Sequence, residues 1–160
     1  MRWGFATVAL LVTVLLTGTG CPDAPDAKVY FLVSSPSAEN SDSYILPLTK
    51  PSDIQHARAL IDDPDNTDRH IAAARIAASG KSTAYVNRDL LNPPTIWSWH
   101  VVEFLGFADT TIEIYDGWPT YVDENLDQWL TETNSTIGFW SYTVTRELTE
   151  DEVETGILAP

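Results

Sequence analysis

Residues 96–104 read Ile-Trp-Ser-Trp-His-Val-Val-Glu-Phe, and this stretch decides the predicted fold. Its β-branched and aromatic residues are typical of a β-strand. A turn is expected at residues 106–109, after which residues 110–115 place Ile112 and Ile114 on one face of a second strand. We therefore predict that the two strands form an antiparallel hairpin.

Three segments precede this hairpin along the chain. Residues 28–33 form an apolar run rich in β-branched and aromatic side chains, which predicts a strand. Residues 44–48 are a shorter run interrupted by a proline, which favours an edge strand. Residues 70–79 are ambiguous, because their alanines favour helix while alternate residues from Ala72 to Ile76 share one strand face.

A helix is predicted between the second and third of these segments, with Ser52 as its N-cap. Apolar residues then recur at helical spacing as far as Ile61. We expect the helix to end near Asp62, because Pro64 disfavours helical backbone at the residue before it.

The last third of the chain predicts one more helix and one more strand. Pro119 suits the first turn of a helix. Its expected buried stripe consists of Val122, Leu126, Trp129 and Leu130. Residues 139–148 alternate in polarity, which predicts a strand with Trp140 and Tyr142 on one face. Together the elements predict an α+β fold, a mostly antiparallel sheet of five or six strands with two or three helices packed on it.

The chain of 160 residues is strongly acidic, with 23 Asp and Glu against 9 Lys and Arg and a formal net charge of −14. Such a charge repels nucleic acid, which we exclude as a partner. The length fits a single globular domain, which we place at residues 28–148, followed by an acidic tail at residues 149–160 that is expected to fray.

The N-terminus has the features of an export signal. Residues 3–16 are almost wholly apolar and residues 17–20 are small. Cys21, the single cysteine, follows directly and resembles the lipid-attachment site of a bacterial lipoprotein, although Gly18 stands where that site usually has leucine.

These features predict where the protein resides. Residues 1–20 are expected to be a signal peptide, and residues 21–27 a tether that begins at a lipidated Cys21. The expected location is the bacterial cell envelope, with a lipid anchor to the membrane through Cys21. Simple secretion and an uncleaved anchor are the alternatives.

Motifs for known cofactors are missing from the sequence, so we predict none. It has no nucleophile elbow, Gly-rich phosphate loop, HExxH or CxxC. The acidic segment at residues 62–68 is not an EF-hand loop, because the sixth and twelfth positions counted from Asp63 are Asp68 and Ala74 instead of Gly and Glu.

The predicted hairpin supplies the first candidate site. Folding back near Phe107 would bring Glu113 and Asp116 close to His100. A histidine with two carboxylates can bind a divalent metal, act as an acid–base pair or recognise a ligand. The alternative is a structural histidine that is hydrogen-bonded to a carboxylate.

The second candidate site is aromatic. The chain has six Trp, six Tyr and five Phe, most of which are expected in the core. Trp97, Trp118 and Tyr121 lie at the ends of predicted elements, where exposed rings can stack on sugars or contact a partner.

Several motifs in combination resemble a known family. They are Trp97-Ser98-Trp99-His100, residues 111–117 (Thr-Ile-Glu-Ile-Tyr-Asp-Gly), Tyr121-Val122-Asp123 and Leu126-Asp127. The family consists of small exported domains, one of them at the N-terminus of a slime-mould cell-surface glycoprotein, and some members carry a calmodulin-related name. The resemblance covers about residues 44–148 and implies a fold and an exported setting but no established reaction. It also implies a strand at residues 70–77.

The resemblance also reveals a departure. Many relatives have a cysteine at the position of Tyr115 and a Cys-Pro-Trp run where this chain has Gly138-Phe139-Trp140. The resemblance implies that these two cysteines form a disulfide in relatives. Both are absent here, and we expect Tyr115 to pack against Gly138 without a covalent link.

Two classes of function follow from these observations. The first is a non-enzymatic binding module for a protein, a glycan or a divalent metal. The second is a small hydrolase-like enzyme that uses His100 with Glu113 or Asp116. The absence of a nucleophile motif favours the binding module.

Overall fold

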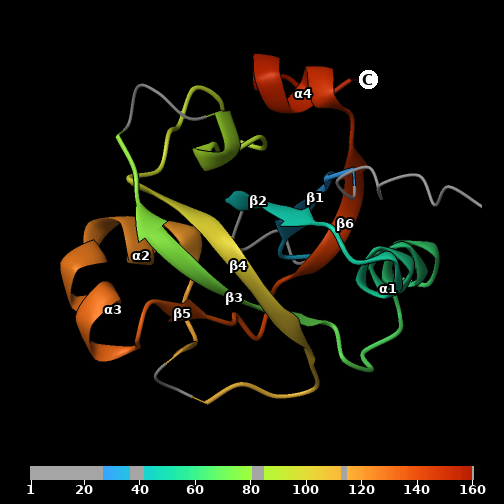
Figure 1. Cartoon of the computed structure of the whole chain (residues 1–160), viewed down its shortest axis with the longest axis horizontal. Coiled ribbons are helices and arrows are strands. Elements are labelled where there is room, and N and C mark those ends of the chain that lie inside the picture. The colour runs from blue at the N-terminus through green and yellow to red at the C-terminus, as the bar shows by residue number, and fades with distance from the viewer. Residues whose placement is uncertain (1–26, 37–41, 81–84, 113–114, 160) are drawn as a thin grey trace, which may run out of the picture.

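The computed structural model describes residues 27–36, 42–80, 85–112 and 115–159 (Figure 1). The predicted signal peptide, Cys21 and Glu113 lie outside these ranges. Within them, no helix is long and apolar enough to cross a bilayer.

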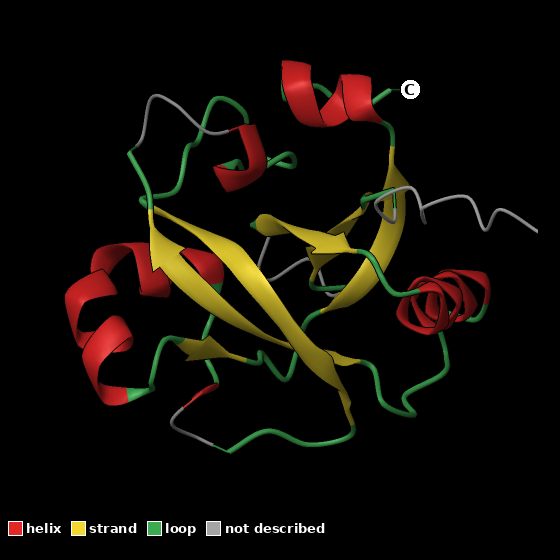
Figure 2. Ribbon diagram, in the orientation of Figure 1, coloured by secondary structure: helices red, strands yellow, loops and turns green. Residues whose placement is uncertain are grey.

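The predicted α+β class is confirmed, and the six strands divide between two antiparallel sheets of three strands each (Figure 2). In the first sheet β1 (Val29–Ser34) lies between β2 (Ser43–Leu48) and β6 (Thr143–Leu148). β2 is therefore an edge strand, as its internal proline predicts.

The second sheet is built around an alanine-rich strand. β3 (Ile71–Ala78) lies between β4 (Trp99–Ala108) and the short β5 (Thr136–Ile137). Alternate residues of β3 from Ala72 to Ile76 are buried, as their strand spacing predicts. Burial of this face against a core prevails over the helical preference of alanine.

The predicted hairpin between residues 96–104 and 110–115 is wrong. β4 continues through the expected turn to Ala108 and pairs with β3, which places Gly106 opposite Ala73. Gly106 has a φ of 145°, and the register of the two strands shifts between Ala73 and Ala74. Glycine here permits a bulge within a strand and not a reversal of the chain. Residues 110–112 form no strand.

The first helix agrees with the sequence prediction except at its start. α1 (Pro51–Asp62) packs beside β6 and buries Ile54, Ala57 and Leu60 (Figure 1). The N-cap is Lys50 and makes no side-chain capping bond, so the predicted cap at Ser52 is wrong. Pro51 occupies the first turn, where its missing N–H costs nothing.

The helix predicted from Pro119 is divided into two short ones. α2 (Pro119–Glu124) and α3 (Leu126–Glu132) meet at Asn125, which ends the first and begins the second. Val122 and Trp129 are buried, as the predicted stripe requires. Both helices lie beside the second sheet (Figure 1).

The C-terminal segment is helical and is not the frayed tail that its acidic composition predicts. α4 (Glu150–Thr155) begins with a capping box, in which Thr149 and Glu152 bind each other's backbone N–H groups. Glu152 is also buried and pairs with Arg146 of β6. The acidic residues at the start of α4 stabilise it because they lie at the positive end of its dipole.

Two hydrophobic clusters hold the domain together. The larger one fills the space between the sheets and is closed by α1 on one side and by α2 and α3 on the other. Its largest side chains include Tyr44, Trp99, Phe139 and Tyr142. The smaller cluster lies under α4 and includes Ile45, Leu90 and Val153. The first sheet is therefore covered on both faces.

Candidate functional site

The structure lacks the hairpin on which the first candidate site, His100 with Glu113 and Asp116, was predicted. His100 lies in β4 opposite Ala77 of β3. Asp116 lies in the loop before α2, where its Oδ1 accepts hydrogen bonds of 2.9 Å from the backbone N–H groups of Gly117 and Trp140. Asp116 therefore braces two loops. Among the described residues, no group of three or more His, Cys, Asp or Glu side chains is arranged to hold a metal.

His100 instead faces a cleft of about 760 Å3 between β2 and β4, the facing edge strands of the two sheets. The sheets meet at one end of these strands, where the ring centroids of Tyr44 and Trp99 are 5.8 Å apart. Farther along, Pro47 and Leu48 line one wall of the cleft and residues 100–104 line the other. Figure 1 shows β2 and β4 next to each other in the middle of the molecule.

The cleft combines apolar walls with a few charges. Its charged side chains are Lys28, Lys50, Asp53 and Glu103, and the last forms an ion pair of 3.0 Å with Arg75. Neither lysine takes part in an ion pair with another described residue. No ion pair with a described residue therefore compensates the positive charges of these two lysines at the cleft.

Among the described residues, His100 is the one histidine that lines this cleft. Burial lowers its pKa, so the ring is neutral at neutral pH. Its Nδ1 is buried and has no hydrogen-bond partner in the described part of the chain. A neutral imidazole has one donor and one acceptor, so His100 can bind a polar group that enters the cleft.

The three aromatic candidates separate into one core residue and one exposed pair. Trp97 is 3% exposed, stacks on Trp99 at 6.3 Å, and donates its Nε1–H to the Ser43 carbonyl at 2.9 Å. Trp97 thus serves the core, and no part of it is available to a ligand at the surface. The strand face that carries Trp97 and Trp99 is the buried one.

Trp118 and Tyr121 remain exposed, at 43% and 36%. Their ring centroids are 5.1 Å apart and their planes are tilted by 41°. Tyr121 also packs edge-on against the buried ring of Trp129 at 5.8 Å. Gly117 packs directly against the Trp129 ring, since a Cβ at this position would come within 3.0 Å of that ring. The exposed pair is therefore held in place by packing from below.

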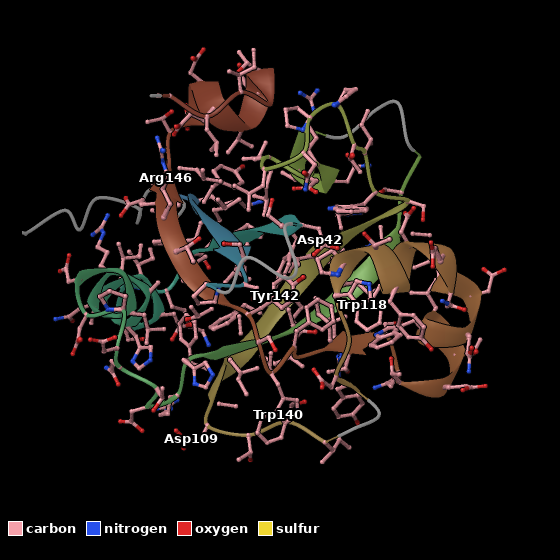
Figure 3. All side chains as sticks on the ribbon, turned by 180° about the vertical axis from the view of Figure 1, so that it is seen from behind. Asp42, Asp109, Trp118, Trp140, Tyr142 and Arg146 are labelled. Carbon is pink, nitrogen blue, oxygen red and sulfur yellow. The ribbon has the colours of Figure 1, made fainter. Side chains whose placement is uncertain are left out.

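Other buried polar residues were missed by the sequence reasoning. Asp42 is 8% exposed and accepts hydrogen bonds from the Tyr142 hydroxyl and from the N–H and hydroxyl of Thr120. It thereby caps α2 from a distant loop, and Figure 3 shows Asp42 and Tyr142 side by side. Asp89 similarly accepts bonds from Ser43. Both are contacts between distant segments, for which the sequence has no local signal.

The expected contact between Tyr115 and Gly138 is present. The backbone N–H of Gly138 donates to the Tyr115 carbonyl at 3.0 Å. The two positions at which relatives are inferred to have a disulfide are therefore joined here by a backbone hydrogen bond.

The comparisons with known proteins give one positive result. Comparisons with the curated proteins and with the solved structures found no significant match to the chain. The family model of the BP-74 N-terminal domain matches residues 27–151, which include all six strands and α1, α2 and α3. The chain therefore belongs to the BP-74 N-terminal domain family.

Proposed function

We propose that this chain is an exported, non-enzymatic binding module that recognises a neutral glycan through Trp118 and Tyr121. The observation that carries the proposal is the pair of exposed, adjacent rings, tilted by 41° to each other. The apolar C–H face of a sugar ring packs on aromatic rings in this setting, while its hydroxyl groups stay available for hydrogen bonds.

Rigidity of the pair supports binding. Tyr121 is wedged against Trp129, and Trp118 precedes the first turn of α2. Because the rings are already ordered, a ligand loses little affinity to the cost of fixing them.

The charges around the pair favour a neutral glycan. Glu124 is exposed at the end of α2, and Asp116 lies two residues before Trp118. These carboxylates accept hydrogen bonds from hydroxyl groups and repel sulfated or uronic sugars. The formal net charge of −14 acts in the same direction over longer distances.

The setting remains the one that the sequence predicts. We propose that Cys21 carries a lipid which anchors the domain in the bacterial cell envelope, with secretion as the alternative. Mass spectrometry of the mature N-terminus distinguishes a lipidated Cys21 from a free end. The hydrolase alternative is not proposed, because the hairpin that would unite His100 with Glu113 and Asp116 does not form.

The test is a screen of neutral and acidic glycans, followed by titration calorimetry on the best neutral binder. Trp118→Ala and Tyr121→Ala should each weaken binding about tenfold, which corresponds to about 1.4 kcal/mol. Trp140→Ala is the matched control, because Trp140 is 44% exposed and Figure 3 places it away from Trp118. Thermal unfolding verifies that each variant is folded.

Two results would overturn the proposal. One is a screen in which only acidic glycans bind or none does. The other is a neutral glycan whose affinity falls with Trp140→Ala and is unchanged by Trp118→Ala and Tyr121→Ala.

A further inference from the structure

We infer that the cleft between β2 and β4 binds a small amphipathic carboxylate, a molecule with an apolar body and one negative charge. This site is separate from the aromatic pair and does not depend on the proposed glycan function. Three features carry the inference: the shape of the cleft, its uncompensated charge and the imidazole of His100 that lines it.

The shape of the cleft fits a small molecule. Its volume of about 760 Å3 lies within the usual range for ligand sites. Apolar side chains from both sheets and from the 3-10 helix η1 (Tyr85–Asn87) form the walls. They are Pro47, Leu48, Val86, Val101, Val102 and Phe104. Val102 is 54% exposed, so apolar surface remains at the mouth for a ligand to cover.

The charge of the cleft selects the polar end of the ligand. Arg75 neutralises Glu103, which leaves Lys28 and Lys50 against Asp53. Among the described residues that line the cleft, one positive charge is therefore in excess, in a chain whose formal net charge is −14. The described ion pairs that remain, Arg58–Glu147 and Arg146–Glu152, use arginines that do not line the cleft. A ligand with a single carboxylate would neutralise this excess positive charge.

The imidazole of His100 gives a further reason to expect a polar ligand atom, because its ring lines the cleft. Its Nδ1 is closed to solvent and has no partner in the described part of the chain, so the ring nitrogen that a ligand can reach is Nε2. His100 is neutral, so a carboxylate oxygen can accept a hydrogen bond from its ring N–H without a further charge entering the cleft. The lysines and His100 thus supply the polar contacts, and the walls contact the apolar body.

The test compares octanoate with octanamide, which share an apolar chain and differ in charge. In calorimetry and NMR titrations of the full domain, octanoate should bind and shift the amide signals of residues 47–50 and 100–104. Octanamide should bind at least about tenfold more weakly. Lys28→Gln and Lys50→Gln should each weaken octanoate binding at least about threefold.

Matched variants give the controls. Arg58→Gln removes one positive charge on α1 outside the cleft and should leave octanoate binding unchanged. Trp118→Ala should also leave it unchanged, which separates this site from the glycan site. The inference is wrong if octanoate fails to bind at about 10 mM, if octanamide binds equally well, or if both lysine variants behave like Arg58→Gln.

Discussion

Tyr44 and Tyr142 are both buried in the larger core, and their phenols are unusually hard to ionise. Burial raises the pKa of Tyr44. It also raises the pKa of Tyr142, and the hydrogen bond to the carboxylate of Asp42 adds to the effect. The cause in both cases is that a phenolate would lie in an apolar environment, and for Tyr142 beside another negative charge.

Alkaline pH should therefore destabilise the domain. Above pH 10, the unfolded chain loses these two protons while the folded chain keeps them, so stability is full below pH 10 and falls as the pH rises. Each tyrosine should contribute a slope of about 1.4 kcal/mol per pH unit. Urea unfolding of the wild type between pH 9 and 11.5 measures this slope.

The variant Tyr142→Phe isolates one of the two tyrosines. It removes the phenol but keeps the ring, so the alkaline slope should fall by about 1.4 kcal/mol per pH unit relative to the wild type. An unchanged slope would mean that Tyr142 ionises equally easily in both states.

Individual site residues were only partly predictable. Trp118 and Tyr121 could be found because they lie at helix ends, where exposure is common. Trp97 has the same aromatic character, but its burial depends on a contact with Ser43, which is distant in sequence. Asp42 gave no signal, because its partners Tyr142 and Thr120 are distant in sequence.

Among the elements, α4 shows how a strong local signal can be overlooked. Thr149 and Glu152 form a capping box, but the acidic composition of residues 150–154 suggested an unfolded tail. The charges at the start of α4 are favourable for the helix dipole, and Glu152 is held by Arg146 and by the Ala159 N–H. For this helix, the spacing of Thr149 and Glu152 therefore predicts the structure better than the acidic composition of residues 150–154 does.

Loss of the cap should weaken this helix selectively. Thr149→Ala removes the side chain that accepts from the Glu152 N–H, and should lower the free energy of unfolding by about 1 kcal/mol. Thr155→Ala is the control, because its hydroxyl binds the Asp151 carbonyl at the exposed end of the same helix. Urea unfolding gives the energies, and hydrogen exchange should show faster exchange in α4 of Thr149→Ala alone. Equal effects of the two variants would refute a capping role.

The pairing of β4 illustrates what an apolar pattern cannot predict. The sequence indicates a strand near residues 96–104 and a possible turn at Gly106, and nearest-neighbour pairing follows as the simplest arrangement. The observed partner is β3, whose Ala72 and Ala74 are buried in the larger hydrophobic cluster. Strand existence is a local property, whereas the choice of partner depends on the shape of the whole sheet.

At the level of the whole molecule, two three-stranded sheets are packed across one aromatic core without any disulfide. Contacts between the sheets come from segments distant in sequence, such as the Trp97 indole with the Ser43 carbonyl and the ring of Tyr44 with that of Trp99. Relatives are inferred to add a covalent link at the positions of Tyr115 and Gly138. In this chain a backbone hydrogen bond occupies that place.

Restoring the inferred link should stabilise the domain. The bond between the Gly138 N–H and the Tyr115 carbonyl, at 3.0 Å, keeps the two backbones in contact, as a disulfide requires. A Cβ at position 138 would approach the Thr111 hydroxyl oxygen to 3.2 Å, so the Thr111 side chain must shift by a few tenths of an ångström. In a Cys21→Ser background, Tyr115→Cys with Gly138→Cys should oxidise spontaneously and gain about 3 kcal/mol relative to its reduced form.

The reduced double variant is the essential control, because it contains the same two substitutions without the bond. Its free energy of unfolding should lie below that of the wild type, since the half-buried ring of Tyr115 is lost and position 138 gains a side chain beside Thr111. Oxidation should then raise the denaturant midpoint above that of the wild type, because the closed loop restricts the unfolded chain. If the thiols stay free in air, or if oxidation lowers the midpoint, these two positions do not have disulfide geometry in this chain, and the covalent link cannot simply replace the hydrogen bond.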